Sequence, residues 1–282
     1  HLPITSPQDG SNSIFTNTRT CFGAAQDLLA KMKEIAAMDL GGDVADYDVD
    51  GVRVHQIADN TVGMTYAEVA QRGMELGGKF SGESDLPEEL NTLTALSVSR
   101  LAGSALMGIY HDPRHSNNPP GFTVTFMEIE LDKETGKFDI LDLVTIAECG
   151  TVVHPQGLAN QLRGGAVWGI GLSALERHLY DPQNGLPASS GFWQSKIPTY
   201  LDTPAEIGTG WVDLPDPENP VGARGIGEPS MGAVSAALNA AISDALGGHM
   251  FDAAPVTTDM IVNHIAGISE DATPLAQNNF RG

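Results

Sequence analysis

The sequence predicts an α+β fold in which mixed sheets pack against helices. The clearest strand signal is a hairpin, because residues 122–131 and 137–147 alternate apolar and polar side chains around a short turn that contains Gly136. The clearest helix signals are a glycine-rich stretch from about residue 156 to 176 and a stretch over residues 231–246 with apolar residues at helical spacing. Strand pairs and helices of this kind in one chain indicate the α+β class.

The N-terminal part carries its own helix and strand signals. Residues 23–37 form an amphipathic pattern that predicts a helix, and alternation within residues 43–61 predicts two short strands. Thr65 followed by Glu68 is the capping-box pattern, so a second helix is expected to start there and to run to about Leu76.

The stretch ahead of the first helix, residues 13–20, is dense in hydroxyl groups and carries Arg19. Hydroxyl side chains and a guanidinium group are suited to hydrogen-bond a phosphate or a polar heterocycle. The alternative is a polar turn that only precedes the helix. Residues 77–89 read as a Gly-, Ser- and acid-rich link, so we expect two segments, residues 1–90 and residues 91–282.

The predicted helix over residues 156–176 is unusually rich in glycine. Each interior glycine costs about 0.8–1 kcal/mol relative to alanine, so a close contact must justify them. One face, formed by Gly157, Gly164, Val167 and Gly171, would let another backbone or a flat ligand lie against the helix. Gln161 lies on this face, where its amide would reach such a ligand. The alternatives are helix–helix packing for the glycines and a plain exposed side chain for Gln161.

The stretch VGARGIGEPSMG, residues 221–232, holds four glycines and one carboxylate, Glu228. Pro229 suits the first position of a helix, which places Glu228 at the cap position. Glutamate is a weaker cap than Ser, Thr, Asp or Asn, and although the helix dipole favours a negative charge there, it does not explain the glycines. Glycines let a backbone approach something bulky. We therefore interpret Glu228 as a base that faces a bound ligand.

The composition excludes some partners. The formal net charge of the 282-residue chain is −21, which argues against nucleic acid or an anionic membrane surface, because both require a positive face. No apolar run is long enough to span a membrane. The chain begins at His1 without a signal-peptide pattern, so we expect a piece of a longer gene product, or a processed start. A cytoplasmic location is expected, with a periplasmic one open through the signal of a partner.

Cysteine and histidine usage predicts no metal ligands in this chain. Cys21 and Cys149 are the two cysteines, whereas an iron–sulfur cluster usually takes four thiolates. They would suffice for one disulfide but are more typical of a reduced interior. His111 and His115 lie four residues apart, but Pro113 breaks the helix that would place both on one face.

Several segments together resemble the molybdenum-binding subunit of the xanthine oxidase family of molybdenum hydroxylases. They are MEIELDKETGK (127–137), CGTVVHPQGLANQLRGGAVWGIGLSALE (149–176), IPTYLDTP (197–204), GARGIGEPSMGA (222–233) and NAAISDALG (239–247), with SPQDG and TRTCFGAA within residues 6–25. The resemblance covers nearly the whole chain. It implies the α+β fold of the second molybdopterin-binding half of the large subunit, with residues 1–90 near the nucleotide part of the cofactor and residues 91–282 carrying the catalytic loop.

The resemblance also implies roles for individual residues. Glu228 matches the glutamate that acts as base beside the molybdenum, and Gln161 matches a glutamine that hydrogen-bonds the pterin. The other implied cofactor-binding residues are Gly225, Ile226 and Gly227 near the metal ligands and, more loosely, Thr16, Thr18 and Arg19 near the nucleotide end of molybdopterin cytosine dinucleotide. The molybdenum is held through the pterin rather than by protein ligands.

The activity implied is oxidation of an aldehyde or an N-heterocycle with oxygen derived from water, with electrons passed to iron–sulfur clusters and FAD on partner chains. The implied partners are an iron–sulfur subunit, a flavin subunit, a small-molecule substrate and a separate chain that carries the N-terminal half of the molybdenum subunit. Arg224 stands where lysine is common, Arg177 where a second acid is common, and residues 194–196 replace a usual Asp-Tyr, which leaves the substrate class open.

Two other interpretations compete with this one. The first alternative is a non-catalytic structural subunit that has kept the fold. The second alternative is a nucleotide-binding module. The glycines of residues 221–232 do not give GxGxxG spacing, and residues 211–220 ahead of them do not have the pattern of a strand, which argues against it.

Overall fold

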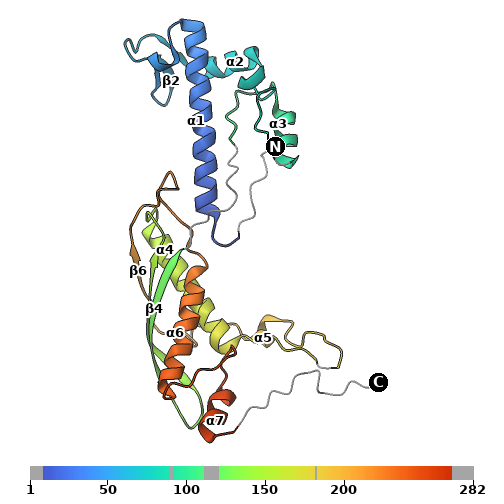
Figure 1. The fold of residues 1–282 in the computed structure, drawn as a ribbon, viewed down its shortest axis with the longest axis vertical. Coiled ribbons are helices and arrows are strands. Elements are labelled where there is room, and N and C mark those ends of the chain that lie inside the picture. Colours follow the sequence, from blue (N-terminus) through green and yellow to red (C-terminus); the bar gives the residue numbers. More distant parts are fainter. Residues whose placement is uncertain (1–8, 89, 91, 111–120, 182, 269–282) are drawn as a thin grey trace. The chain divides into compact units, whose positions relative to one another are not determined.

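A computed structural model describes residues 9–88, 90, 92–110, 121–181 and 183–268. The chain forms two compact units (Figure 1). Unit 1 comprises residues 1–119 together with 217–221, and unit 2 comprises residues 120–216 together with 222–282. The boundary at residue 90 suggested by the sequence falls inside unit 1. Both units combine helices with a small sheet, and the predicted α+β class is confirmed.

Unit 1 is built from helices and a three-stranded sheet. Its elements are α1 (Ser13–Leu40), β1 (Tyr47–Val49), β2 (Arg53–Gln56), β3 (Gly63–Thr65), α2 (Tyr66–Leu76) and α3 (Thr92–Leu101), with single 3-10 turns at Val44–Asp46 and Gly78–Phe80. The capping box at α2 is confirmed, since Glu68 N donates to Thr65 Oγ1 and Thr65 N donates to Glu68 Oε2.

The first helix begins earlier than predicted, at Ser13 rather than Gly23. The hydroxyl-rich stretch is therefore neither a loop nor a turn but the opening of α1. The hydroxyl of Thr18 donates to the Ile14 carbonyl at 2.5 Å, and that of Thr20 donates to the Thr16 carbonyl at 3.1 Å. Bonds of this kind to the preceding turn let polar side chains remain within a helix.

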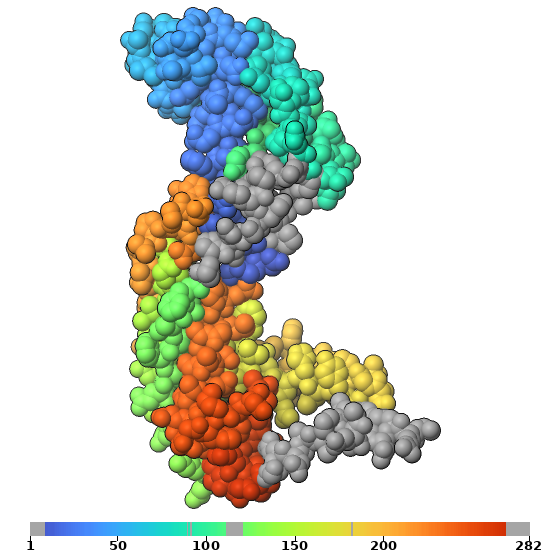
Figure 2. Space-filling model, viewed as in Figure 1, coloured from blue at the N-terminus to red at the C-terminus, as the bar shows by residue number. Residues whose placement is uncertain are grey.

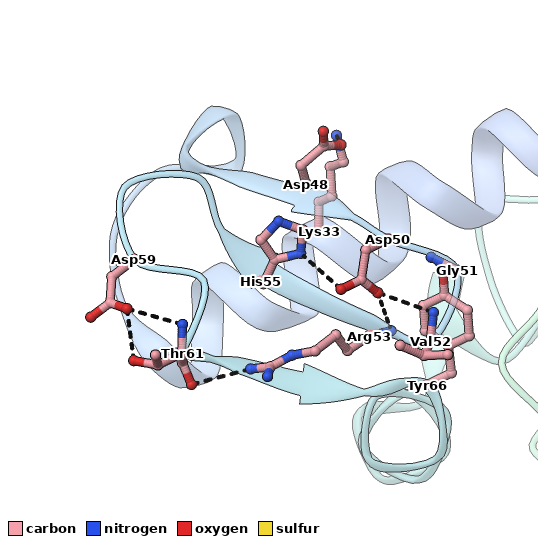
Figure 3. A network of polar contacts seen from close by, with 10 residues as sticks. All are labelled: Lys33, Asp48, Asp50, Gly51, Val52, Arg53, His55, Asp59, Thr61 and Tyr66. Carbon is pink, nitrogen blue, oxygen red and sulfur yellow. Dashed lines mark hydrogen bonds and ion pairs between the residues drawn. The ribbon is translucent and has the colours of Figure 1, made fainter.

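The sheet of unit 1 contains one strand more than the two predicted, and its turns are closed by carboxylates (Figure 3). The side chain of Asp50 accepts from the backbone N–H groups of Val52 and Arg53 at 3.1 and 3.0 Å. The side chain of Asp59 accepts from the hydroxyl and the backbone N–H of Thr61. The hydrogen bond from the Val52 N–H is the main cause that lowers the pKa of the Asp50 carboxyl. The hydrogen bond from the Thr61 hydroxyl is the main cause that lowers the pKa of the Asp59 carboxyl.

A buried cluster joins α1, α2 and the sheet of unit 1. Side chains of α1 meet those of the sheet and α2 in a core formed by Met32, Ile35, Ala36, Tyr47, Val54, Val69 and Phe80. The apolar face predicted for the first helix is confirmed, because Met32 and Ile35 on that face are buried. Burial of this apolar surface holds α1 against the sheet.

Unit 2 contains the predicted hairpin and both glycine-containing helices. Its elements are β4 (Phe122–Leu131), β5 (Phe138–Glu148), α4 (Pro155–Ile170), α5 (Phe192–Ser195), β6 (Gly208–Val212), α6 (Pro229–Ala245) and α7 (Thr258–Ala266). Strands β4 and β5 pair antiparallel, with a bulge between Glu128 and Ile129. The predicted hairpin is confirmed.

A third strand, β6, completes this sheet and corrects the prediction that residues 211–220 contain no strand. It pairs parallel to β5, with Val144 opposite Gly208 and Ala147 opposite Trp211. The glycines of β6 permit the close pairing, since a Cβ at Gly208 would lie 2.8 Å from the side chain of Val144. The proline- and acid-rich part that follows is irregular, as predicted.

Helices α4 and α6 pack against each other through glycines. A Cβ at Gly165 would overlap the hydroxyl of Ser230, and a Cβ at Gly169 would lie 2.6 Å from the carbonyl oxygen of Met231. For these two glycines the helix-packing alternative is therefore correct. Helix α4 ends at Ile170, not at Glu176, and continues as one π-helical turn, Gly171–Leu175. None of the described helices is both long and apolar enough to cross a membrane.

Buried apolar residues connect the sheet of unit 2 to its helices. One cluster lies between β5, α4 and α6 and consists of Leu143, Ala166, Ile170 and Val234. A second joins α6 to α7 and consists of Leu238, Ile242, Val256 and Ile261. These clusters hold the second half of α4 against β5 and α6, and the later part of α6 against α7.

Candidate functional site

The glycine-rich loop ahead of α6 is bonded to the backbone that follows β5. The Gly222 carbonyl accepts from the N–H of Thr151 at 2.7 Å, and Arg224 N donates to the Cys149 carbonyl at 2.7 Å. Gly150 and Ala223 form an isolated antiparallel bridge between these bonds. Gly150 must be glycine there, because its φ is +73° and an added Cβ would overlap the Gly222 carbonyl. The start of the loop is therefore held by regular backbone pairing.

A charge cluster, defined here as Arg224, Glu148 and Asp216, holds the same loop through side chains. The Arg224 guanidinium donates through Nε to Asp216 Oδ2 and through Nη1 to Glu148 Oε2, each at 2.5 Å. The Asp216 side chain is only 3% exposed. Partial burial lowers the pKa of Arg224, but the bonds to Asp216 and Glu148 outweigh burial and leave that pKa raised. The guanidinium thus stays charged and fixed beside the loop.

Ile226 provides the apolar attachment of the loop. Its side chain is buried in a cluster with Ala147, Cys149, Leu158 and Leu162, which brings β5, the loop and the first half of α4 together. The flanking residues Gly225 and Gly227 are only partly buried. The loop therefore buries the side chain of Ile226 in the core and leaves glycine backbone on either side of it.

Glu228 occupies the cap position of α6, and Pro229 is the first helical residue, as predicted from the sequence. The backbone of Glu228 is helical, with φ −109° and ψ −33°, and its side chain makes no capping hydrogen bond. Its carbonyl accepts from Met231 N at 3.0 Å. The carboxylate is half-buried at the end of the helix where the dipole favours negative charge. The side chain is therefore not used to cap the helix.

Gln161 lies on the exposed side of α4, next to Leu162 of the Ile226 cluster. Gly164, one turn further on, is also exposed, and a Cβ added there would meet nothing within 4 Å. The rest of the predicted glycine face is different. A Cβ at Gly157 would lie 2.7 Å from the ring of His154, and one at Gly171 would lie 2.9 Å from Pro198. The open part of this face is thus limited to the surroundings of Gln161 and Gly164.

Thr16, Thr18 and Arg19 belong to unit 1, in the first turns of α1. The hydroxyl of Thr18 is bonded within the helix and also accepts from Asn219 Nδ2 at 2.8 Å. The guanidinium of Arg19 lies over the ring of Phe15, 5.1 Å from its centroid. The structure thus gives Thr18 and Arg19 contacts within unit 1, while the loop, Glu228 and Gln161 belong to unit 2.

The structure adds three functional candidates that the sequence did not indicate: Asn219, Asp216 and Glu148. Asn219 Nδ2 also donates to the Phe15 carbonyl at 3.1 Å, and its Oδ1 accepts from Val221 N at 3.0 Å. Asn219 therefore fixes residues 217–221, which lead directly into the glycine loop, to the start of α1. The sequence did hold a hint of the charge cluster. Arg224 is one of only 15 lysines and arginines in a chain with 36 aspartates and glutamates, so an acidic partner could have been anticipated.

The cysteines and histidines give no sign of a metal centre in the part of the chain that the structure describes. No group of three or more His, Cys, Asp or Glu side chains there could hold a metal ion, and His111 and His115 lie outside the described residues. Both cysteines are free. Burial raises the pKa of the Cys149 thiol, and the carboxylates of Glu148 and Asp213 add to the effect. Cys149 is therefore a packed thiol beneath the loop rather than a reactive thiolate.

Comparison with known proteins identifies the family of this chain. The model of a family described as "Molybdopterin cofactor-binding domain" matches residues 1–204. The 6-hydroxypseudooxynicotine dehydrogenase complex subunit gamma of Paenarthrobacter nicotinovorans is 34% identical over 166 residues, 58% of this chain and 21% of that protein. The match to the family model ends at residue 204, before the loop that carries Glu228.

Solved structures share the fold. Quinoline 2-oxidoreductase from Pseudomonas putida 86 is 25% identical, with a TM-score of 0.58, over 87% of this chain and 28% of that one. The Cu,Mo-CO dehydrogenase in its carbon monoxide-reduced state is 23% identical, with a TM-score of 0.59, over 90% of this chain and 30% of that one. The chain spans less than a third of the length of each of these relatives. It belongs to the molybdopterin cofactor-binding domain family, that of the molybdenum-binding subunits of the xanthine oxidase group.

Proposed function

We propose that this chain is a catalytic component of a molybdenum hydroxylase, with Glu228 as the general base. One observation carries the proposal: a half-buried carboxylate stands at the start of α6 without capping the helix, at the end of a loop held by Arg224 and Ile226. A general base needs a carboxylate held in a fixed position within hydrogen-bond reach of its proton. The fixed loop supplies the position, and the glycines beside it leave room for a large group.

The residues present fit a molybdopterin group. The amide of Gln161 offers both a donor and an acceptor to a heterocycle, and the bare surface at Gly164 leaves space that a side chain would fill. Gly225, Ile226 and Gly227 offer the loop backbone to the metal end of the group. Thr16, Thr18 and Arg19 remain the candidates for its nucleotide end, for which we propose the cytosine dinucleotide form.

The bound cofactor would supply the redox chemistry, while the protein supplies position and proton transfer. In the proposed reaction the Glu228 carboxylate accepts the proton that the water-derived oxygen loses. Arg224 keeps the loop in place through its bonds to Glu148 and Asp216. Gln161 orients the pterin through its amide. We place the substrate among N-heterocycles or aldehydes, since one relative is named for quinoline, an N-heterocycle.

Partner chains are required by this proposal. The iron–sulfur clusters and FAD would lie on an iron–sulfur subunit and a flavin subunit. Within the molybdenum subunit, residues 1–90 of this chain would form the nucleotide-proximal segment and residues 91–282 the catalytic one. The chain purified alone should then hold no cofactor, and stoichiometric molybdenum in it would refute a shared cradle. We expect a cytoplasmic complex, because both cysteines are free.

Turnover by a Glu228→Gln variant of the intact complex tests the base. We expect a loss of about 10²–10⁴-fold in kcat with quinoline-like heterocycles and aldehydes as substrates, at unchanged molybdenum content. Glu134→Gln, an exposed carboxylate in the β4–β5 turn, is the matched control. Unchanged turnover with molybdenum retained would remove Glu228 as the base. A wild-type complex without molybdenum would favour the alternative, a non-catalytic structural subunit.

A second variant tests the cofactor surface. Gly164→Ala fills the open side of α4 without meeting any atom of this chain. If the pterin lies there, the molybdenum content of the complex falls although the chain itself remains folded. A variant that keeps full molybdenum content would exclude Gly164 from the proposed cradle.

A further inference from the structure

The start of strand β4 lies against the chain on both sides of Glu228. Within unit 2, β4 runs beside α6, and Figure 2 shows its green surface next to the orange surface of that helix. A Cβ added at Gly121, the residue before β4, would lie 3.4 Å from the Gly225 carbonyl oxygen and 3.5 Å from the ring of Pro229. One end of β4 therefore contacts the loop that precedes Glu228 and the helix that follows it.

Thr123 makes a polar contact between β4 and this helix. Its hydroxyl donates to the Pro229 carbonyl at 3.0 Å, across 106 residues of sequence. Successive side chains of a strand point to opposite faces, so Phe122 is 65% exposed on one face while Thr123 on the other reaches α6. Thr125 lies on the same face as Thr123, but its hydroxyl donates to that of Thr145 at 3.1 Å. Of these two similar threonines, one is thus bonded to α6 and the other to β5.

The first turn of α6 is the part of the helix that such a bond stabilises most. The leading N–H groups of a helix have no partner within it, and a side-chain cap usually stabilises them. The cap residue Glu228 makes no side-chain capping hydrogen bond. The Glu228 carbonyl accepts from Met231 N at 3.0 Å, so the backbone of Glu228 follows the position of the first turn. Thr123 thus holds, from another element, a helix start that its own cap residue does not hold.

We propose that Thr123 is a positioning residue for Glu228. By fixing the Pro229 carbonyl, the Thr123 hydroxyl fixes the backbone from which the Glu228 side chain projects. A general base must lie within hydrogen-bond reach of its proton, and a displacement of about 1 Å lowers a rate by up to about 10²-fold. The Thr123 proton is used in the bond to Pro229, so Thr123 acts through Glu228 rather than on the substrate. The inference rests on the proposed function, in which Glu228 is the base.

Steady-state kinetics of the intact complex tests this role, with the same substrates as for Glu228→Gln. Thr123→Val keeps the shape of the side chain and removes the hydroxyl. We expect kcat per molybdenum to fall about tenfold or more, because the base is displaced, while KM changes by less than about threefold. Thr123→Ser keeps the hydroxyl and should hold kcat within about twofold of the wild-type value, since it keeps the bond to the Pro229 carbonyl.

Thr125→Val is the matched control for the loss of a hydroxyl bond. It removes a hydroxyl from the same face of the same strand, where the partner is Thr145 and not the helix that follows Glu228. Its kcat per molybdenum should stay within about twofold of the wild-type value, even where its melting temperature falls as much as that of Thr123→Val. Equal values of kcat per molybdenum for Thr123→Val and Thr125→Val would overturn the positioning role, because a purely structural bond would affect both variants alike.

Hydrogen exchange of the purified chain tests the same contact without the complex. The amide of Met231, which is bonded to the Glu228 carbonyl, reports whether the first turn of α6 is closed. We expect it to exchange about threefold to tenfold faster in Thr123→Val, the effect of one lost hydrogen bond, and at the wild-type rate in Thr125→Val and Thr123→Ser. An unchanged Met231 rate in Thr123→Val, in a chain that circular dichroism shows to be folded, would overturn the proposal.

The two proposals fail separately. Loss of turnover in Glu228→Gln beside full turnover in Thr123→Val would overturn the positioning role and keep Glu228 as the base. Full turnover in Glu228→Gln with molybdenum retained, beside faster Met231 exchange in Thr123→Val, would overturn the base and leave Thr123 as a structural anchor of α6.

Discussion

The guanidinium of Arg224 donates to the carboxylate of Glu148 across 76 residues of sequence, at 2.5 Å. The contact links the end of β5 to the loop that carries Glu228, and Asp216 binds the other side of the same guanidinium. A proposed general base is therefore positioned by an ion pair whose members lie far apart in the chain.

Removal of this cation should destabilise unit 2 and displace the loop. Arg224→Met leaves two carboxylates without their partner in a site that is largely buried, and a loss of about 3 kcal/mol in the free energy of unfolding is expected. Arg224→Lys keeps the charge but not the forked geometry, so a smaller loss is expected. Urea denaturation measures both, with the exposed Lys133→Met as control. A loss no larger than that of the control would show that the cluster does not hold the loop.

Neighbouring glycines of α4 should respond in opposite directions to the same substitution. Gly169→Ala places a Cβ 2.6 Å from the Met231 carbonyl and 2.8 Å from Val234, and such overpacking costs about 1–3 kcal/mol. Gly164→Ala meets open space and should gain about 0.8–1 kcal/mol of helix propensity. Thermal or urea unfolding of the two variants tests the difference. Equal effects would mean that α4 and α6 are not packed as described.

Asn219 should be required for order at the start of α1. Asn219→Asp removes the donor to the Phe15 carbonyl and to Thr18 Oγ1 in a site that is 5% exposed, which costs about 1–3 kcal/mol. Hydrogen exchange of residues 13–20 should become faster. Asn60→Asp, at an exposed turn, serves as the comparison and should leave that exchange unchanged. Unaltered protection of residues 13–20 in Asn219→Asp would exclude the role.

The turn from Thr199 to Asp202 should lose stability only in acid. Hydrogen bonds from Thr199 lower the pKa of Asp202 below its usual value of 3.8. A lowered pKa means that the contribution of Asp202 is complete above pH 3.8 and is lost as the pH falls through the lower folded-state pKa. The Thr199 amide resonance, followed by NMR against pH, should report this midpoint, and Asp202→Asn should abolish the titration. A midpoint at or above the usual value would contradict the assignment.

Local signals predicted much of this fold. The β4–β5 hairpin was predictable because its alternation and its turn lie within a few residues of each other, and Pro229 marked the start of α6 with Glu228 at its cap. Strand β6 was not predicted because its pairing with β5 is long-range. The early start of α1 was not predicted because a polar sequence does not show that the hydroxyls of Thr18 and Thr20 bond to carbonyls of the preceding helical turn.

The candidate site was predictable in part for the same reason. Glu228 and its glycines are adjacent in sequence, so their pattern stands out. The Arg224 cluster depends on Glu148 and Asp216, whose approach is a product of tertiary structure. Gln161 was identified from the resemblance of the sequence to a known family. Only the structure shows that the helix surface is open at Gly164 and packed against Met231 and Val234 at Gly169.

The assignment of residues 217–221 to unit 1 has a genetic consequence. Neither unit is encoded by one uninterrupted stretch of DNA. A truncated gene that ends before residue 217 would lack Asn219, and one that starts at residue 120 would keep those five residues without the helix they bind. Neither unit can therefore be produced in full from one continuous segment of the coding sequence.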